Sequence, residues 1–389
     1  MNPVVVTNQM DDRVTGAKKL SFLDEARGVA VLMVILFHCL GAAMGSDRIA
    51  WSGMFRDLSF RPGMKSWLLL SPLTFGYLGV AIFFVISGFC IHLSFSRLKV
   101  ENPWREFFHR RVFRILPPYY AWLAIFVILG LVLPHQFTSG GGVKQIVAHM
   151  LLIHNWHSST FFGINCSFWS LAVEWQLYLL YPILMIAVQK WSWRNTLVML
   201  GIIEITFRFP WSMLFGHTSD LELQPWLDFP FAYWWSWAIG AWIAYDWLAD
   251  RRLPLAHLPI WLPVIATIIC WEFRPLNNYT FMTGALAMAV WLSQKLEAKF
   301  VNTASHRSSQ FKVLVSRFCI VVGGWSYSLY LLHQPFINLI SRLYQREILV
   351  HGIVLLGMTF FTTLLITIPM AWFSYKWIEL PGIELGKQN

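Results

Sequence analysis

The sequence predicts an all-α fold, a polytopic membrane helix bundle of about ten transmembrane helices with both termini in the cytoplasm. The first observation is composition, because 57% of the 389 residues are hydrophobic and only 13% are charged. A soluble chain of this length needs far more polar surface, so this composition excludes a soluble globular enzyme. The second is that the apolar residues form long continuous runs, unlike the alternating pattern of a membrane β-barrel. The third is the distribution of positive charge.

Apolar runs long enough to cross a hydrocarbon core about 30 Å thick predict the individual helices. In chain order they lie near residues 28–45, 72–95, 117–133, 168–189, 195–215, 229–247, 258–271, 279–294, 318–340 and 349–375. Residues 143–157 are amphipathic and predict a helix on the outer membrane surface. We expect residues 1–22 to be a cytoplasmic tail and not a cleaved signal peptide, residues 23–381 one membrane domain, and residues 382–389 a second cytoplasmic tail.

The positive charges set the orientation. The chain has 30 lysine and arginine residues against 20 acidic ones, a net charge of +10. With the N-terminus inside, most of these positive residues fall in the predicted cytoplasmic segments, in agreement with the positive-inside rule. We therefore attribute the excess to membrane orientation and expect no nucleic-acid partner. The scattered cysteines show no metal-binding spacing, and we expect no metal.

Ionisable side chains in the predicted first span indicate a functional site. His38 lies near the middle of that span, and Arg27 and Asp24 precede it by 11 and 14 positions. At about 100° per residue the three side chains fall on one stripe of the helix, running from the cytoplasmic edge toward the membrane centre. The stripe must face protein or a water-filled path, because exposing it to lipid is costly. The alternative is that His38 only hydrogen-bonds a neighbouring helix.

Later apolar runs also contain ionisable residues, namely His92, Glu174, Glu204, Arg208 and His333. At membrane depth each of them is by default a functional hypothesis. An unpaired carboxylate at Glu174 would be expelled or protonated, so this residue needs a partner.

A basic segment, residues 103–120, is the second candidate site. Arg111 and Arg114 are three positions apart and share one face of a helix, and Arg110 is adjacent. Guanidinium groups paired at the cytoplasmic surface suit phosphate or pyrophosphate. Anchoring to anionic membrane lipids is the alternative interpretation.

Six stretches in order resemble the membrane-bound acyltransferase-3 family. They are LDEARGVAVLMVILFH (23–38), FFVISGFCI (83–91), RRVFRILPPYY (110–120), SFWSLAVEWQLYLLYP (167–182), YSLYLLHQP (327–335) and YKWIELP (375–381). Glu25, Trp175 and His92 depart from the family pattern, and none of them removes an expected catalytic group.

The resemblance implies an integral membrane O-acyltransferase of a bacterial inner membrane. It would move an acyl group, commonly acetyl, from cytosolic acyl-CoA to a hydroxyl of a carbohydrate or lipid-linked glycan. The phosphates of acyl-CoA would bind Arg110, Arg111 and Arg114. Because the chain ends at Asn389, we expect it to lack the C-terminal hydrolase-like domain of some family members.

Within this interpretation His38 acts as general base on the acceptor hydroxyl, since an imidazole titrates near neutral pH. A transient acyl-histidine is the alternative route. Arg27 would position acyl-CoA or orient Asp24, and Glu174 and His333 would orient His38 or bind the acceptor.

A secondary transporter of a small polar or anionic solute is the main alternative, although no second copy of the Arg27–His38 arrangement is present. A haem protein using membrane histidines is a weaker one. The sequence leaves open the acceptor, the acyl-chain length and assembly into a homo-oligomer. Outer residues that could contact a sugar are His154, Asn155, Trp156, His157 and Asn165.

Overall fold

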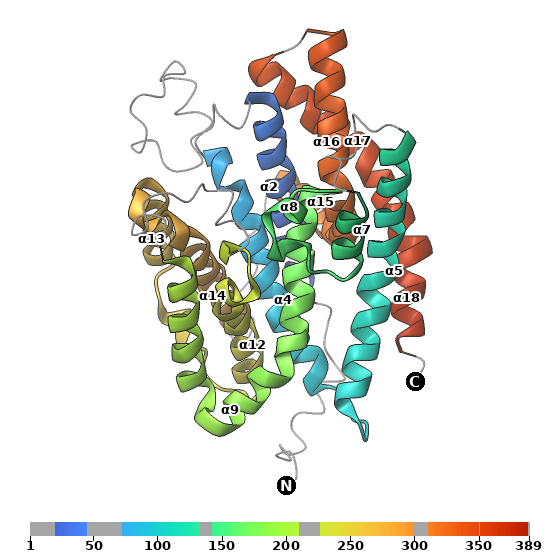
Figure 1. Cartoon of the computed structure of the whole chain (residues 1–389). Helices are drawn as coiled ribbons and strands as arrows, with labels where there is room; N and C mark the ends of the chain where they lie inside the picture. The colour runs from blue at the N-terminus through green and yellow to red at the C-terminus, as the bar shows by residue number, and fades with distance from the viewer. Residues whose placement is uncertain are drawn as a thin grey trace.

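The computed structural model describes residues 20–44, 72–132, 142–209, 226–298, 310–349 and 351–387. Within these ranges the chain forms helices and turns and contains no strand, in agreement with the predicted all-α class (Figure 1). The predicted N-terminal tail lies outside the described residues as far as residue 19. The longer helices are α2 (Ser21–Met44), α4 (Gly79–Ser96), α5 (Pro103–Val132), α9 (Trp169–Arg208), α12 (Trp234–Leu248), α13 (Trp261–Glu272), α14 (Thr280–Ala298), α15 (Gln310–Gly324), α16 (Ser326–Glu347) and α17 (Gly352–Ser374).

Shorter elements connect these helices. They are η1 (Phe75–Leu78), α7 (Gly142–Met150), η2 (His154–Trp156), α8 (Ser158–Phe161), η3 (Cys166–Phe168), η4 (Pro230–Ala232), η5 (Pro254–His257), η6 (Arg274–Tyr279), the π-helical turn η7 (Tyr375–Glu379) and α18 (Leu380–Leu385). Every predicted apolar run overlaps a helix over its described residues. α9 covers two of these runs because it is broken at Ser192, where φ is 69° and ψ is 161°. The chain turns back at this break (Figure 1).

Several of these helices can cross a membrane. Among the described residues, five segments are long and apolar enough to do so: Ser21–Met44, Pro72–Ser96, Pro103–Val132, Cys166–Arg208 and Gly352–Leu385. α15 and α16 meet at a bend of 85° and make a sixth if they are counted as one span. Large apolar side chains such as Leu131 and Leu365 are each 77% exposed, as suits lipid-facing positions. The chain is a multi-pass helical membrane protein.

Glycine pairs bring four of the helices into backbone contact. A Cβ atom added to Gly88 would lie 2.0 Å from the carbonyl oxygen of Trp237, and one added to Gly240 would lie 2.0 Å from that of Val85. α4 and α12 therefore pack as closely as small residues allow. The same reciprocal contact joins Gly28 of α2 to Gly323 of α15.

The amphipathic segment at 143–157 is helical over only part of its length. α7 ends at Met150, and Leu152 then adopts a positive φ of 56° before η2. Gln145 and His149 are buried on the inner face of α7, whereas Val143 is 76% exposed on the other. An apolar outer face agrees with the predicted position at a membrane surface.

Candidate functional site

Two cavities lie in the helix bundle. The first, here the arginine cavity, has a volume of about 270 Å³ and is lined by α2, α4, α5, α9, α15, α16, η7 and α18. Its charged lining residues are Asp24, Arg27, Arg111, Arg114, Glu174 and Glu379. The second, here the histidine cavity, has a volume of about 300 Å³ and contains His38.

Two cations of the arginine cavity retain unused hydrogen-bond donors. Arg111 donates from Nη2 to Ser94 Oγ over 2.7 Å, but its buried Nε has no partner. Arg114 lines the same cavity and makes no hydrogen bond with the residues that the structure describes. Arg27, in contrast, forms a 3.1 Å ion pair with Asp24 and donates to Cys90 Sγ over 3.2 Å. Arg111 and Arg114 thus present free donors that an anion can occupy.

The two other carboxylates of this cavity are held by hydroxyl groups. Glu174 accepts hydrogen bonds from Tyr178 and, over 2.6 Å, from Ser87. Glu379 accepts from Ser328 over 3.1 Å. A carboxylate withdrawn from water needs such donors, and the three hydroxyl groups supply them.

The histidine cavity brings the predicted pair His38 and His333 together, with ring centroids 5.2 Å apart. His333 Nδ1 lies 2.6 Å from the carbonyl oxygen of Tyr330, which can only accept, so Nδ1 carries the proton. His333 Nε2 then accepts from Ser167 Oγ over 3.2 Å, and both of its nitrogens are occupied. His38 lines the cavity and makes no hydrogen bond within the described ranges, so its ring nitrogens are available to a ligand.

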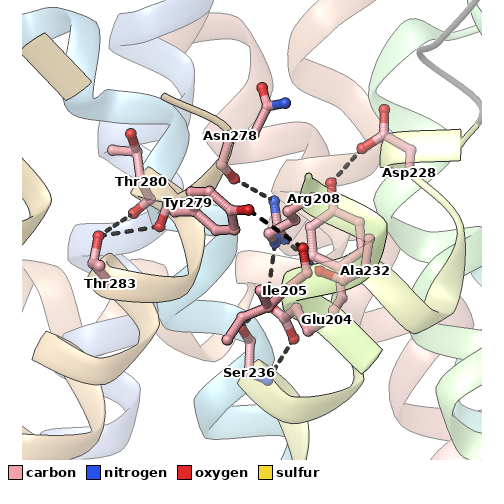
Figure 2. A network of polar contacts seen from close by, with 11 residues as sticks. Glu204, Ile205, Arg208, Asp228, Ala232, Ser236, Asn278, Tyr279, Thr280 and Thr283 are labelled. Atoms are coloured by element: carbon pink, nitrogen blue, oxygen red, sulfur yellow. Dashed lines mark hydrogen bonds and ion pairs between the residues drawn. The ribbon is translucent and has the colours of Figure 1, made fainter. Parts of the chain in front are cut away.

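One partner of a buried ion pair lines the histidine cavity. Arg208 lines the cavity, donates from Nε to the fully buried Glu204 over 3.1 Å, and lies over the rings of Tyr233 and Phe281 at 4.7 and 5.0 Å. It also donates to the backbone carbonyls of Ala232 in η4 and Asn278 in η6, so one side chain fastens three segments together (Figure 2).

The remaining polar groups of this cavity resemble a binding surface for a sugar. Asp228, which accepts from the hydroxyl of Tyr233, lines it together with Asn277, Asn278 and Trp169. Carboxylate, amide and indole groups are the side chains that hydrogen-bond and stack on hydroxylated rings.

The predicted stripe on α2 is divided between the cavities. Asp24 and Arg27 line the arginine cavity, whereas His38 lines the histidine cavity. Glu174 lines the arginine cavity and not the cavity that contains His38. Of the two residues predicted to orient His38, His333 lies beside it. Arg110 forms an ion pair with Glu106 and lines neither cavity.

Other predicted residues have structural partners. His92 hydrogen-bonds the hydroxyl of Tyr181 over 2.9 Å and lines neither cavity. Asn155 donates to Gln176 and to the backbone of Asp228, and Asn165 donates to the carbonyl of Leu331. Both asparagines therefore hold the segment 142–168 onto the bundle.

A histidine pair in that segment lies outside the membrane-spanning helices. The rings of His149 and His154 stack with centroids 3.9 Å apart and planes 6° apart. Burial lowers the pKa of His149 to about 4, and burial together with the charge of His149 lowers the pKa of His154 well below its usual range. Both rings are held in the neutral form.

Sequence reasoning did not single out Ser87, Asp228, Tyr330 or Glu379 as site residues. In the sequence Ser87 looks like a small residue at a close helix contact. The structure gives that role to its neighbour Gly88. Asp228 and Glu379 carried a usable signal, since each is an isolated acid among apolar residues.

Comparison with known proteins agrees with this architecture. Residues 20–373 match the acyltransferase domain family acyltransferase-3. The O-acetyltransferase OatA of Staphylococcus aureus is 26% identical over 345 residues, 80% of this chain and 53% of that protein. The peptidoglycan O-acetyltransferase OatA of Listeria monocytogenes is 24% identical over 68% of this chain and 45% of its own length.

The regulator of hypoxia-inducible factor 1 of Caenorhabditis elegans is 27% identical over 55% of this chain and 44% of its own length. The chain thus spans about half the length of the curated relatives it matches. No solved structure matches it. Because the family match covers most of its length, the chain belongs to the membrane-bound acyltransferase-3 family.

Proposed function

We propose that this protein is an integral membrane O-acyltransferase that moves an acetyl group from cytosolic acyl-CoA to a hydroxyl of a carbohydrate or lipid-linked glycan. The observation that carries the proposal is the imidazole of His38, which no described residue hydrogen-bonds, in a cavity beside a second cavity that contains the unpaired Arg111 Nε. The relatives named O-acetyltransferases, one of them acting on peptidoglycan, support this substrate class.

The proposed topology is a single acyltransferase domain, residues 23–381, with about ten spans and both termini cytoplasmic in a bacterial inner membrane. α2 then enters from the cytoplasm, so Asp24 and Arg27 lie at its cytoplasmic end. His38 follows Arg27 by 11 residues, which is about 16 Å along a helix axis. In this orientation the arginine cavity faces the cytosolic donor, and the histidine cavity lies deeper.

The donor would bind in the arginine cavity. Arg111 Nε and the guanidinium of Arg114 supply donors for phosphate oxygens, and the pairing of Arg27 with Asp24 fixes the position of a third cation. Arg110 was also predicted to bind the donor, but it could do so only if its ion pair with Glu106 were broken.

The chemistry would take place at His38. Its free ring nitrogen removes the proton of an acceptor hydroxyl while the oxygen attacks the thioester carbonyl. A carbon–oxygen bond forms, the carbon–sulfur bond breaks, and the released thiolate takes up the proton from His38. His333, fixed by Tyr330 and Ser167, acts as a positioning residue that packs against His38.

Thiol release from acetyl-CoA by the protein in nanodiscs, with a panel of glycan acceptors, tests this proposal. We expect His38→Ala to lower turnover by about 10²–10⁴-fold, the usual contribution of a general base. The buried His92→Gln is the matched control, since His92 lines neither cavity. If the protein retains labelled acetyl when no acceptor is present, the result would support an acyl-histidine intermediate in place of the general-base route.

Donor binding is measured separately from turnover. Cys90 lines the arginine cavity, so acetyl-CoA should slow its alkylation by a maleimide. Arg111→Gln/Arg114→Gln should abolish this protection, and the exposed Arg105→Gln on the same helix should keep it. A folded wild type that neither binds nor consumes any acyl-CoA would overturn the proposal in favour of a secondary transporter.

A further inference from the structure

The two cavities are separated by a wall one side chain thick. Val80 of α4 and Tyr330 of α16 line both the arginine cavity and the histidine cavity. On one side of them Phe84 of the arginine cavity packs edge-on against Tyr233 and Phe281 of the histidine cavity, at 5.3 and 5.8 Å between ring centroids. The wall is therefore built of apolar and aromatic side chains.

Tyr330 is held in this wall by contacts of its hydroxyl, its ring and its backbone. Its side chain is 95% buried and its hydroxyl lies 2.6 Å from Ser170 Oγ, while its backbone carbonyl accepts from His333. Its ring contacts Phe83 at 6.0 Å and His333 at 5.0 Å between centroids. Fixed at both ends, the ring cannot swing aside without breaking contacts that reach His333 and, through it, His38.

We propose that Tyr330, held by Ser170, is a specificity-determining residue that limits the transferred acyl group to about the size of acetyl. The inference rests on the proposed function, in which phosphates bind on the arginine side and the hydroxyl is activated by His38 on the other. The thioester carbonyl must then reach the wall at Val80 and Tyr330. The substituent on that carbonyl lies against the tyrosine ring, so each added methylene meets a rigid aromatic surface.

The position of the Tyr330 ring should also affect hydrolysis of the donor. The ring stands between a donor thioester and part of the histidine cavity, so it shields the thioester from water on that side. Removing the ring should therefore increase hydrolysis of acetyl-CoA in the absence of acceptor.

The test compares acetyl-, propionyl- and butyryl-CoA as donors for the full-length protein in nanodiscs. The wild type should prefer acetyl-CoA by kcat/KM. Tyr330→Ala should raise the butyryl-to-acetyl ratio of kcat/KM by about tenfold or more, the lower end of what one or two methylenes change in a pocket. Tyr330→Phe keeps the ring but loses the hydrogen bond to Ser170, so it should change the ratio far less than Tyr330→Ala does. Ile383→Ala removes a side chain from the arginine cavity on α18, which contributes no residue to the wall, and should leave the ratio unchanged.

Several outcomes would overturn the inference. It fails if the wild type uses butyryl-CoA as well as acetyl-CoA, or if Tyr330→Ala retains the wild-type ratio. If Tyr330→Ala does not fold, Val80→Ala, which thins the same wall from α4, must show the shift instead. A wild type that consumes none of the donors refutes the proposed function, whereas acetyl transfer with an unchanged ratio refutes the role of Tyr330 alone.

Discussion

The Glu204–Arg208 pair should be worth several kcal/mol to the fold around the histidine cavity. Glu204 is completely buried and accepts three hydrogen bonds, from Arg208 Nε, from Ser236 Oγ over 2.6 Å and from the Ser236 backbone N–H over 3.0 Å. Because its two oxygens both face N–H groups, a glutamine at this position must turn its own amide N–H₂ toward one of them. Glu204→Gln therefore loses a hydrogen bond and also leaves a buried guanidinium without a counter-charge.

Removing one partner of a buried ion pair costs about 3–5 kcal/mol. At roughly 2 °C per kcal/mol for a large domain, the melting temperature of Glu204→Gln should fall by about 5–10 °C. Intrinsic tryptophan fluorescence during heating in nanodiscs measures this shift. Glu101→Gln, the same chemical change at an exposed position, is the matched control.

A second variant separates charge from packing. Adding Arg208→Met to Glu204→Gln removes the unpaired cation but also the donors to the carbonyls of Ala232 and Asn278, so the double variant should not regain the stability of the wild type. A melting temperature of Glu204→Gln within about 2 °C of the wild type would refute the reasoning. So would a double variant that melts at the temperature of the wild type.

Two further predictions concern the segment 142–168 and the helix contacts. Since burial holds the pKa of His149 at about 4, the unfolded state binds more protons than the native state between pH 6.5 and 4. Stability should fall by about 3 kcal/mol as the pH drops through that window, and His149→Gln should flatten the dependence of melting temperature on pH. An unchanged pH profile in His149→Gln would contradict this. Gly88→Val places a side chain against the carbonyl of Trp237 and should prevent a monodisperse size-exclusion peak, whereas Gly357→Ala, with open space at its Cβ, should behave like the wild type.

Much of the fold follows from the sequence for simple physical reasons. Continuous apolar runs can only be helices in lipid, because every backbone group must find its partner within the segment. The break at Ser192 falls between the predicted runs 168–189 and 195–215, although nothing at that position resembles Gly or Pro. The end of α7 at Met150 was also missed, because amphipathic spacing continues past it to residue 157 while the backbone turns at Leu152.

The site was predictable in its parts but not in its arrangement. Charge at membrane depth indicated His38, Arg27 and Glu174, and all three line cavities. Close backbone contacts, such as that of Gly28 with Gly323, decide which helices pack together. A single sequence does not reveal that these two positions are in contact. The contact between His38 and His333 therefore emerges only from the packing of α2 against α16.

The spacing along α2 restricts the kind of donor that fits the proposed reaction. Helical phase places Arg27 and His38 on one face, but about 16 Å of helix axis separates them, and Tyr330 and Val80 stand between their cavities. A compact donor such as acetyl phosphate would carry its charge and its acyl carbon within one cavity and could not contact both ends. A donor whose phosphates lie far from its acyl group, joined by a slender arm, matches the separation. In the proposed reaction, acyl-CoA would therefore fit the two cavities better than a small acyl phosphate, and the reactive end of the donor would meet the acceptor at the wall.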